Sequence, residues 1–169
     1  MEEIHASFLD ATDLQLLDLL QIDASQSNLA LAQRLHVSPP TCLRRVKRLQ
    51  AAGLIERQVA VLSADRLAPL LGHGLEAIVE VTLERQGAEH LAAFEARVVA
   101  DDAVQQCYRV SPGPDFILHL RAPDMPAYLA LQQRLFTADA NVRNVKAFFS
   151  VKRAKFAPRL QLQARPHAA

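Results

Sequence analysis

The spacing of apolar residues changes near residue 76, and the pattern that follows it leaves few possible folds. Apolar and polar residues alternate over 77–84, 104–110, 116–121 and 145–151, which predicts four strands. Residues 88–100 and the segment that begins at Pro123 have helical spacing instead. The order strand, helix, strand, strand, helix, strand is that of a ferredoxin-like βαββαβ domain.

The first third of the chain has the pattern of three helices. Leucines give residues 12–21 an apolar stripe, and a second, short helix is expected to end near Val37. Ser38 and Pro39 begin a third helix, because Ser caps a helix and Pro suits its first turn. Gly53 stops that helix, and short strands are expected at 54–55 and 59–62.

Composition and charge exclude several classes of protein. Half of the 169 residues are apolar and 22% are charged, as in globular proteins, and no apolar run is long enough to span a membrane. The two cysteines lie far apart, so we expect no disulfide framework and a reducing, cytoplasmic location. Although the net charge is only +1, residues 34–57 carry six bases and one acid. Such an island suits contact with a polyanion, and a solvated mixture of charges is the alternative.

The third helix separates its residues by chemistry. When residues 41–49 are projected at about 100° per residue, one side is apolar and the other is basic. With two short helices before it, this arrangement is typical of a helix-turn-helix whose last helix enters the major groove of DNA. An exposed basic face with no nucleic-acid partner is the alternative. The residues that we predict to contact DNA are Ser38, Thr41, Arg44, Arg45, Lys47 and Arg48.

Four collinear motifs resemble the leucine-responsive regulator/AsnC family, also called feast/famine regulators. They are Leu9-Asp10-Ala11-Thr12-Asp13, the segment from Ser38 to Leu49 that is followed by Gly53-Leu54-Ile55, Val79-Glu80-Val81, and Pro123 to Tyr128. The resemblance covers about residues 8–152. It implies an α+β protein with a winged helix-turn-helix at 1–63, a linker at 64–75 and a ferredoxin-like ligand-binding and oligomerisation domain at 76–169.

The resemblance also implies partners. They are double-stranded DNA, further copies of the chain in a homodimer or an octamer, and a small effector, usually an amino acid, bound between subunits. The residues matching the family's effector site are Gly113, Asp115, Met125, Phe148 and Phe149. Pro112 stands where the family usually has Gly, which removes a backbone N–H donor. The alternatives are that Asp115 is a turn residue and that the other side chains are core or interface residues.

Two further functions remain open from the sequence. Some proteins similar to this family are sirohaem decarboxylases, for which His119 and Arg109 are the candidate residues here. A ligand-independent architectural regulator is the other reading, which the altered loop favours. The histidines lack metal-ligand spacing and no Gly-rich phosphate loop occurs, so we predict no enzyme activity, no metal and no cofactor. The role of the basic residues after Val151 is left open.

Overall fold

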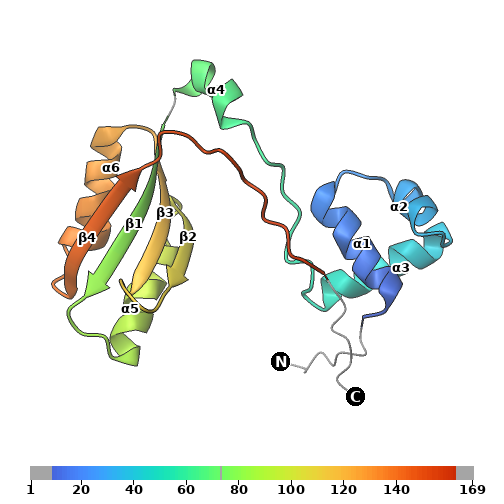
Figure 1. Ribbon diagram of the computed structural model, residues 1–169, viewed down its shortest axis with the longest axis horizontal. Helices are drawn as coiled ribbons and strands as arrows, with labels where there is room; N and C mark the ends of the chain where they lie inside the picture. Colours follow the sequence, from blue (N-terminus) through green and yellow to red (C-terminus); the bar gives the residue numbers. More distant parts are fainter. Residues whose placement is uncertain (1–8, 73, 163–169) are drawn as a thin grey trace. The chain divides into compact units, whose positions relative to one another are not determined.

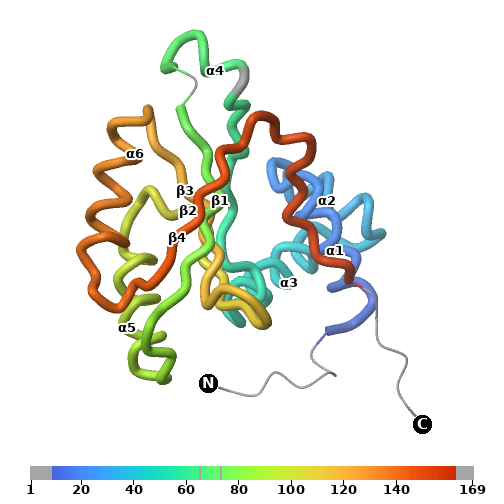
Figure 2. The backbone as a smooth tube through the Cα atoms, turned by 60° about the vertical axis from the view of Figure 1, so that its left-hand side comes forward, coloured from blue at the N-terminus to red at the C-terminus, as the bar shows by residue number. Residues whose placement is uncertain are grey.

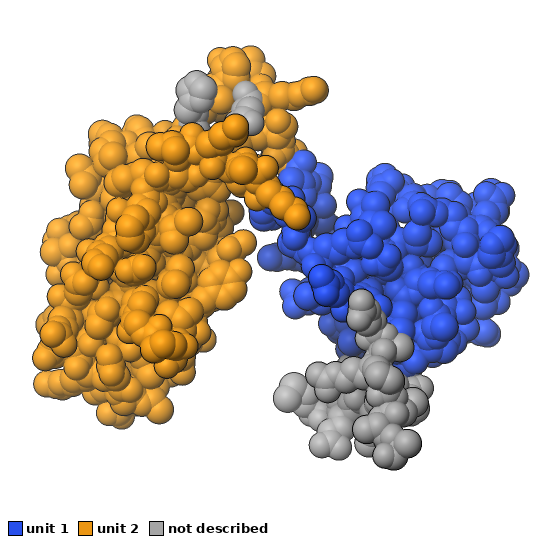
Figure 3. Space-filling view, in the orientation of Figure 1, with its two compact units in different colours: residues 1–61, 156–169 blue, residues 62–155 orange. Residues whose placement is uncertain are grey.

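The computed structural model describes residues 9–72 and 74–162, and these divide into two compact units. One unit contains residues 1–61 and 156–169, and the other contains residues 62–155 (Figure 3). The outer limits of the predicted domains, at residues 1 and 169, lie outside the described residues. No helix in the described ranges is long and apolar enough to cross a bilayer.

Three helices form the first unit, as the sequence predicts: α1 (Ala11–Ile22), α2 (Asn28–Arg34) and α3 (Pro39–Ala51) (Figure 1). Side chains cap each helix at its start, because Asp10, Ser27 and Ser38 accept hydrogen bonds from the first-turn amides. Gly53 follows α3 with a φ of +70°, a conformation that suits glycine at the end of a helix. The buried core of this unit consists of Leu16, Leu31, Ala32, Leu35, Cys42 and Leu49.

The two short strands expected at 54–55 and 59–62 do not form, so the prediction of these strands is wrong. Residues 52–63 contain no strand. A strand needs a neighbour for its backbone hydrogen bonds, and the ladders of the described chain join only the four strands of the second unit. Val59 and Val61 are accordingly 69% and 65% exposed.

The second unit has the predicted ferredoxin-like order. Its elements are α4 (Ala64–Leu71), β1 (Leu75–Leu83), α5 (Ala88–Val99), β2 (Val104–Arg109), β3 (Phe116–Ala122), α6 (Met125–Gln132), a short π-helical turn η2 (Gln133–Thr137) and β4 (Val142–Phe149). The sheet order is β2-β3-β1-β4, with every neighbouring pair antiparallel. Helices α5 and α6 lie together on one side of this sheet (Figures 1 and 2).

Alternation along the strands separates a buried face from an open one. Val79, Val81 and Phe116 are fully buried under the helices, where Phe94 and Phe136 complete the core. The open face carries Ile78, which is 45% exposed, and Phe148, which is 52% exposed. The register pairs these two residues across β1 and β4. One face of the sheet is thus covered by α5 and α6, and the other carries partly exposed apolar residues.

Two segments differ from the predicted domain limits. The expected linker at 64–75 contains the helix α4, capped by Ser63. Residues 156–162, which the sequence assigns to the ferredoxin-like domain, group with the helical unit instead. The reason is a long-range contact, because Arg159 and Leu160 bond to side chains of α1.

Candidate nucleic-acid interface and effector residues

The turn before α3 is built by local hydrogen bonds. The Ser38 hydroxyl accepts from the Thr41 amide at 3.4 Å and donates to the Thr41 hydroxyl at 2.8 Å. The Asn28 side chain, at the start of α2, donates to the carbonyl of Pro39 at 2.8 Å. His36 takes a φ of +55°, in the left-handed region, where the chain reverses between the helices. These contacts hold the first turn of α3 against α2.

Arg44 and Lys47 project from the outer side of α3. Both residues are exposed, and neither forms an ion pair with any residue in 9–72 or 74–162. They are three residues apart, so they lie next to each other on the helix surface. Cys42 and Leu49, on the opposite side, are fully buried. Two neighbouring cations on the outer side of a recognition helix can bind phosphates or the major-groove edge of guanine.

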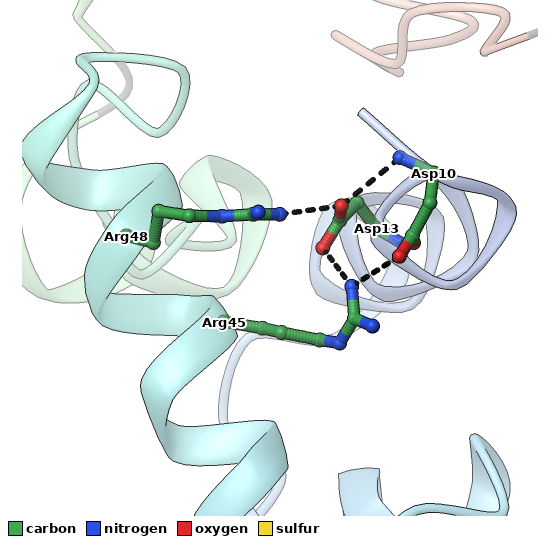
Figure 4. A network of polar contacts seen from close by, with 4 residues as sticks. All are labelled: Asp10, Asp13, Arg45 and Arg48. Carbon is green, nitrogen blue, oxygen red and sulfur yellow. Dashed lines mark hydrogen bonds and ion pairs between the residues drawn. The ribbon is translucent and has the colours of Figure 1, made fainter. Parts of the chain in front are cut away.

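Arg45 and Arg48 have a different environment from Arg44 and Lys47 (Figure 4). Nη1 of Arg45 lies 2.7 Å from the carboxylates of both Asp10 and Asp13, and Nη2 of Arg48 lies 2.5 Å from Asp13. The Asp13 carboxylate also accepts the Asp10 amide at 3.1 Å. We call these four residues — Asp10, Asp13, Arg45 and Arg48 — the arginine clamp, because they fasten α3 to the first turn of α1.

The clamp is centred on a buried charge. The Asp13 side chain is 1% exposed, and the Arg45 side chain is 22% exposed. Burial alone would raise the pKa of Asp13, but the Asp10 amide and the guanidiniums of Arg45 and Arg48 hold the pKa below its ordinary value. Asp13 is therefore a carboxylate at neutral pH, and both Arg45 and Arg48 pair with it.

The sequence contains a signal for the clamp that the helical projection of α3 alone does not use. Asp13 stands at the spacing of Leu16, Leu17 and Leu20, so it falls on the apolar stripe of α1. A carboxylate on such a stripe must be paired once it is buried. In the same projection, Arg45 lies only about 40° from Leu49, next to the buried side of α3.

The predicted effector residues fall into two groups at opposite ends of the sheet. Asp115 lies beside the end of β1, because its side chain accepts the Leu83 amide at 2.7 Å. Phe149 pairs instead with Ala77, near the start of β1, and packs edge-on against Tyr128 of α6 at 4.9 Å between ring centroids. Ala77 and Leu83 are six residue steps apart along the strand, which is about 20 Å.

No single-chain pocket can therefore join Gly113 and Asp115 to Met125, Phe148 and Phe149. Gly113 lies in the Asp115 loop, with a φ of +119°. Met125 begins α6 and is 43% exposed, and Phe149 is 41% exposed. Asp115 also accepts the Gln86 side chain at 3.2 Å, so its carboxylate ties its loop to the end of β1 and to the residue Gln86 that follows the strand.

The two residues considered for enzyme chemistry do not meet. Arg109 pairs with Glu95 of α5 at 2.5 Å, on the helix-covered side of the sheet. His119 pairs with Glu76 at 2.8 Å on the open side. Within the described ranges, no group of three His, Cys, Asp or Glu side chains could hold a metal ion.

Comparison with known proteins gives the family. The family model of the Lrp/AsnC ligand binding domain matches residues 76–160, and that of the AsnC-type helix-turn-helix domain matches residues 9–50. The chain belongs to the Lrp/AsnC family. Its members are transcriptional regulators that join a helix-turn-helix DNA-binding domain to a ligand-binding domain.

Relatives cover nearly the whole chain. The leucine-responsive regulatory protein of Rhizobium meliloti is 34% identical over 91% of this chain and 96% of its own length. The leucine-responsive regulatory protein of Salmonella typhimurium is 32% identical over 93% of each chain. These relatives are named as regulators, which agrees with the prediction of a non-enzyme.

Solved structures agree with this family assignment. An AsnC family regulator from Agrobacterium tumefaciens superposes with a TM-score of 0.79 at 27% identity, over 91% of this chain and 97% of its own. The regulator NMB0573 of Neisseria meningitidis, solved as a complex with L-Met, has a TM-score of 0.75 at 30% identity, over the same shares of each chain.

Proposed function

We propose that α3 contacts DNA directly through Ser38, Thr41, Arg44 and Lys47, and that Arg45 and Arg48 act on DNA binding mainly by holding α3 in place. The observation that supports this division is the contrast along one helix. Arg44 and Lys47 are exposed without an ion pair in the described chain, whereas Arg45 and Arg48 pair with Asp13. Free cations release counterions when they bind phosphate, and paired ones must first give up their carboxylate.

Salt-dependent DNA binding tests this division. We expect Arg44→Ala and Lys47→Ala each to lower the slope of log K against log salt by about 0.9 for each phosphate that the side chain neutralises. Arg66→Ala is the matched control, because Arg66 is an exposed base of α4, outside the helix-turn-helix. Unchanged slopes in both α3 variants would remove these two residues from the interface.

We propose next that two copies of the chain are needed to build an effector site for an amino acid. Gly113 and Asp115 of one copy would face Met125, Phe148 and Phe149 of another, since one copy places these groups about 20 Å apart. The L-Met complex of the Neisseria meningitidis regulator supports the amino-acid class of effector. Phe148, on the open face of the sheet, offers apolar surface to its side chain, whereas Phe149 points to the helix-covered side against Tyr128. Asp115 offers a carboxylate to its amino group.

A thermal-shift titration with each of the twenty amino acids, beginning with L-methionine and L-leucine, tests the effector. A ligand of the native state must raise the unfolding temperature, and the shift grows with ligand concentration. We expect Phe148→Ala to abolish the shift, while Leu129→Ala, at an exposed α6 position, preserves it. If none of the twenty amino acids shifts the transition, the ligand-independent regulator becomes the better account.

We propose finally that the open face of the sheet joins copies into a homodimer, which brings two recognition helices to one DNA site in the cytoplasm. Ile78, Tyr108 and Phe148 support this, being 45%, 54% and 52% exposed on the side of the sheet opposite α5 and α6. Exposed apolar patches of this kind are typical of interfaces. Sedimentation tests the assembly. A dimer or an octamer agrees with it, and a monomer at micromolar concentration contradicts it.

A further inference from the structure

The helical unit contains a groove that the chain's own C-terminal segment helps to line. The groove encloses about 380 Å³ between the second half of α1 and the residues after α3. Its lining includes Leu17, Leu20, Ile55 and Val59, together with Pro158 and Leu160 from the C-terminal segment. Apolar residues of α1 thus share one groove with residues from the far end of the sequence.

Specific polar contacts fix the segment at this groove. Nη2 of Arg159 donates to both carboxylate oxygens of Asp18 at 2.8 Å. The Leu160 amide donates to Oε1 of Gln21 at 2.6 Å, and Nε2 of Gln21 donates to the Leu160 carbonyl at 3.3 Å. The Gln21 amide group therefore satisfies both polar groups of one backbone residue, as a neighbouring strand would.

The same segment is a direct continuation of β4. Phe148 and Phe149 end that strand in the second unit, and the chain belongs to the first unit from Phe156 onward (Figure 3). Helix α1, which Arg159 and Leu160 contact, also carries Asp13 of the arginine clamp and is capped by Asp10. One series of covalent and polar links thus runs from the end of β4, through α1, to α3.

We propose that residues 158–162 form a clasp that transmits the state of the ligand-binding domain to the recognition helix. The clasp begins nine residues after the effector candidate Phe149, and it closes on the helix that positions Arg45 and Arg48. The regulatory role of the clasp rests on the proposed DNA-binding function. The contacts between residues 158–162 and α1 do not depend on that function.

The ion pair of the clasp adds little to holding it closed. Asp18 and Arg159 have side chains that are 40% and 48% exposed, so their ion pair is weak and screened by salt. The clasp can therefore open while α1 remains folded, and a ligand that favours one state would shift the balance between the closed and open forms.

A neutral pair of variants on α1 provides the main test. Gln21→Ala removes both hydrogen bonds to Leu160 without changing charge. Gln15→Ala is the matched control, because Gln15 is exposed on the same helix. We expect faster deuterium uptake at the Leu160 amide, within 158–162, in Gln21→Ala only, together with a change of about fivefold or more in affinity for duplex DNA. The full chain is used in both measurements.

A charge exchange checks that the effect comes from the contact itself. We expect Asp18→Arg to speed uptake at 158–162, and Arg159→Asp in the same chain to restore protection while keeping the wild-type net charge. Chains that end after Ala157 and after Leu162 give a second comparison, since only the shorter one lacks the clasp. We expect the shorter chain to bind DNA like Gln21→Ala and the longer one to bind like the wild type.

The outcomes separate the clasp from the DNA-binding proposal. Uptake at 158–162 that is as fast in the wild type as in Gln21→Ala overturns the clasp. Slow uptake in the wild type, with DNA affinity unchanged by Gln21→Ala, overturns its role in transmission. Failure of the wild type to bind any DNA contradicts the proposed function. The deuterium-uptake measurement then still tests whether the clasp forms.

Discussion

Removal of the Asp13 carboxylate is the perturbation that most directly probes the arginine clamp. Asp13→Ala would leave Arg45, whose side chain is only 22% exposed, without the partner that it shares with Arg48. Breaking a buried pair by removing one member costs about 3–5 kcal/mol. Because Arg45 keeps Asp10 as a partner, we expect a cost near the lower limit, about 3 kcal/mol.

Calorimetry of the full chain measures this cost. For a unit of this size, a destabilisation of about 3 kcal/mol lowers the unfolding midpoint by on the order of 10–20 °C. Glu56→Ala serves as the control, because Glu56 is exposed in the same unit and should shift stability by less than about 0.5 kcal/mol. Asp13→Ala and Glu56→Ala with the same midpoint would refute the clamp as a stabilising element.

Three further predictions concern pH, a helix end and the second core. The pKa of Asp13 is lowered in the folded state, so the stabilisation from its carboxylate is complete above about pH 4 and is lost as the pH falls further. Measurements of the free energy of unfolding at acidic pH should show this loss, and Asp13→Asn should flatten the dependence on pH. Gly53→Ala, at a φ of +70° with no atom within 4 Å of the new Cβ, should cost about 1 kcal/mol from backbone strain alone; urea unfolding that shows no destabilisation would contradict the assignment of Gly53 as the stop of α3. Phe94→Ala empties a site between Phe116 and Phe136 and should destabilise the ligand-binding unit by about 3–5 kcal/mol, and a change below about 1 kcal/mol in thermal unfolding would contradict that packing.

Elements whose signals are local could be predicted from the sequence. The alternation from Ala77 to Leu83 shows one buried face, and β1 follows it in the structure. Ser38, Pro39 and Gly53 mark α3 because capping, ring geometry and positive φ act within a few residues. The helix that begins at Met125 was also predictable, although its last turn is π-helical rather than α-helical.

Features that depend on distant partners could not be predicted in the same way. Val59 and Val61 have the alternation of a strand, yet whether they form one depends on a neighbour that the described chain does not supply. Arg159 and Leu160 bond to α1 across nearly the whole sequence, which no local pattern reveals. The split between Asp115 and Phe149 follows from strand register, which only the folded sheet defines.

The basic face of α3 shows the same limit within a single helix. Its projection distinguishes apolar from basic residues, but it treats all the bases as equivalent. Only Asp13, on another helix, separates Arg45 and Arg48 from Arg44 and Lys47. A residue's charge is thus readable from the sequence, whereas its partner is a property of the fold.

Sequencing the genomic DNA fragments that the purified protein retains tests the central claim most directly. We predict that the wild-type chain enriches a discrete set of fragments with a shared motif, and that a chain with both Arg44→Ala and Lys47→Ala no longer retains this set. Retention of the same fragments by both proteins, or no enrichment by the wild type, would contradict recognition of DNA through the outer side of α3.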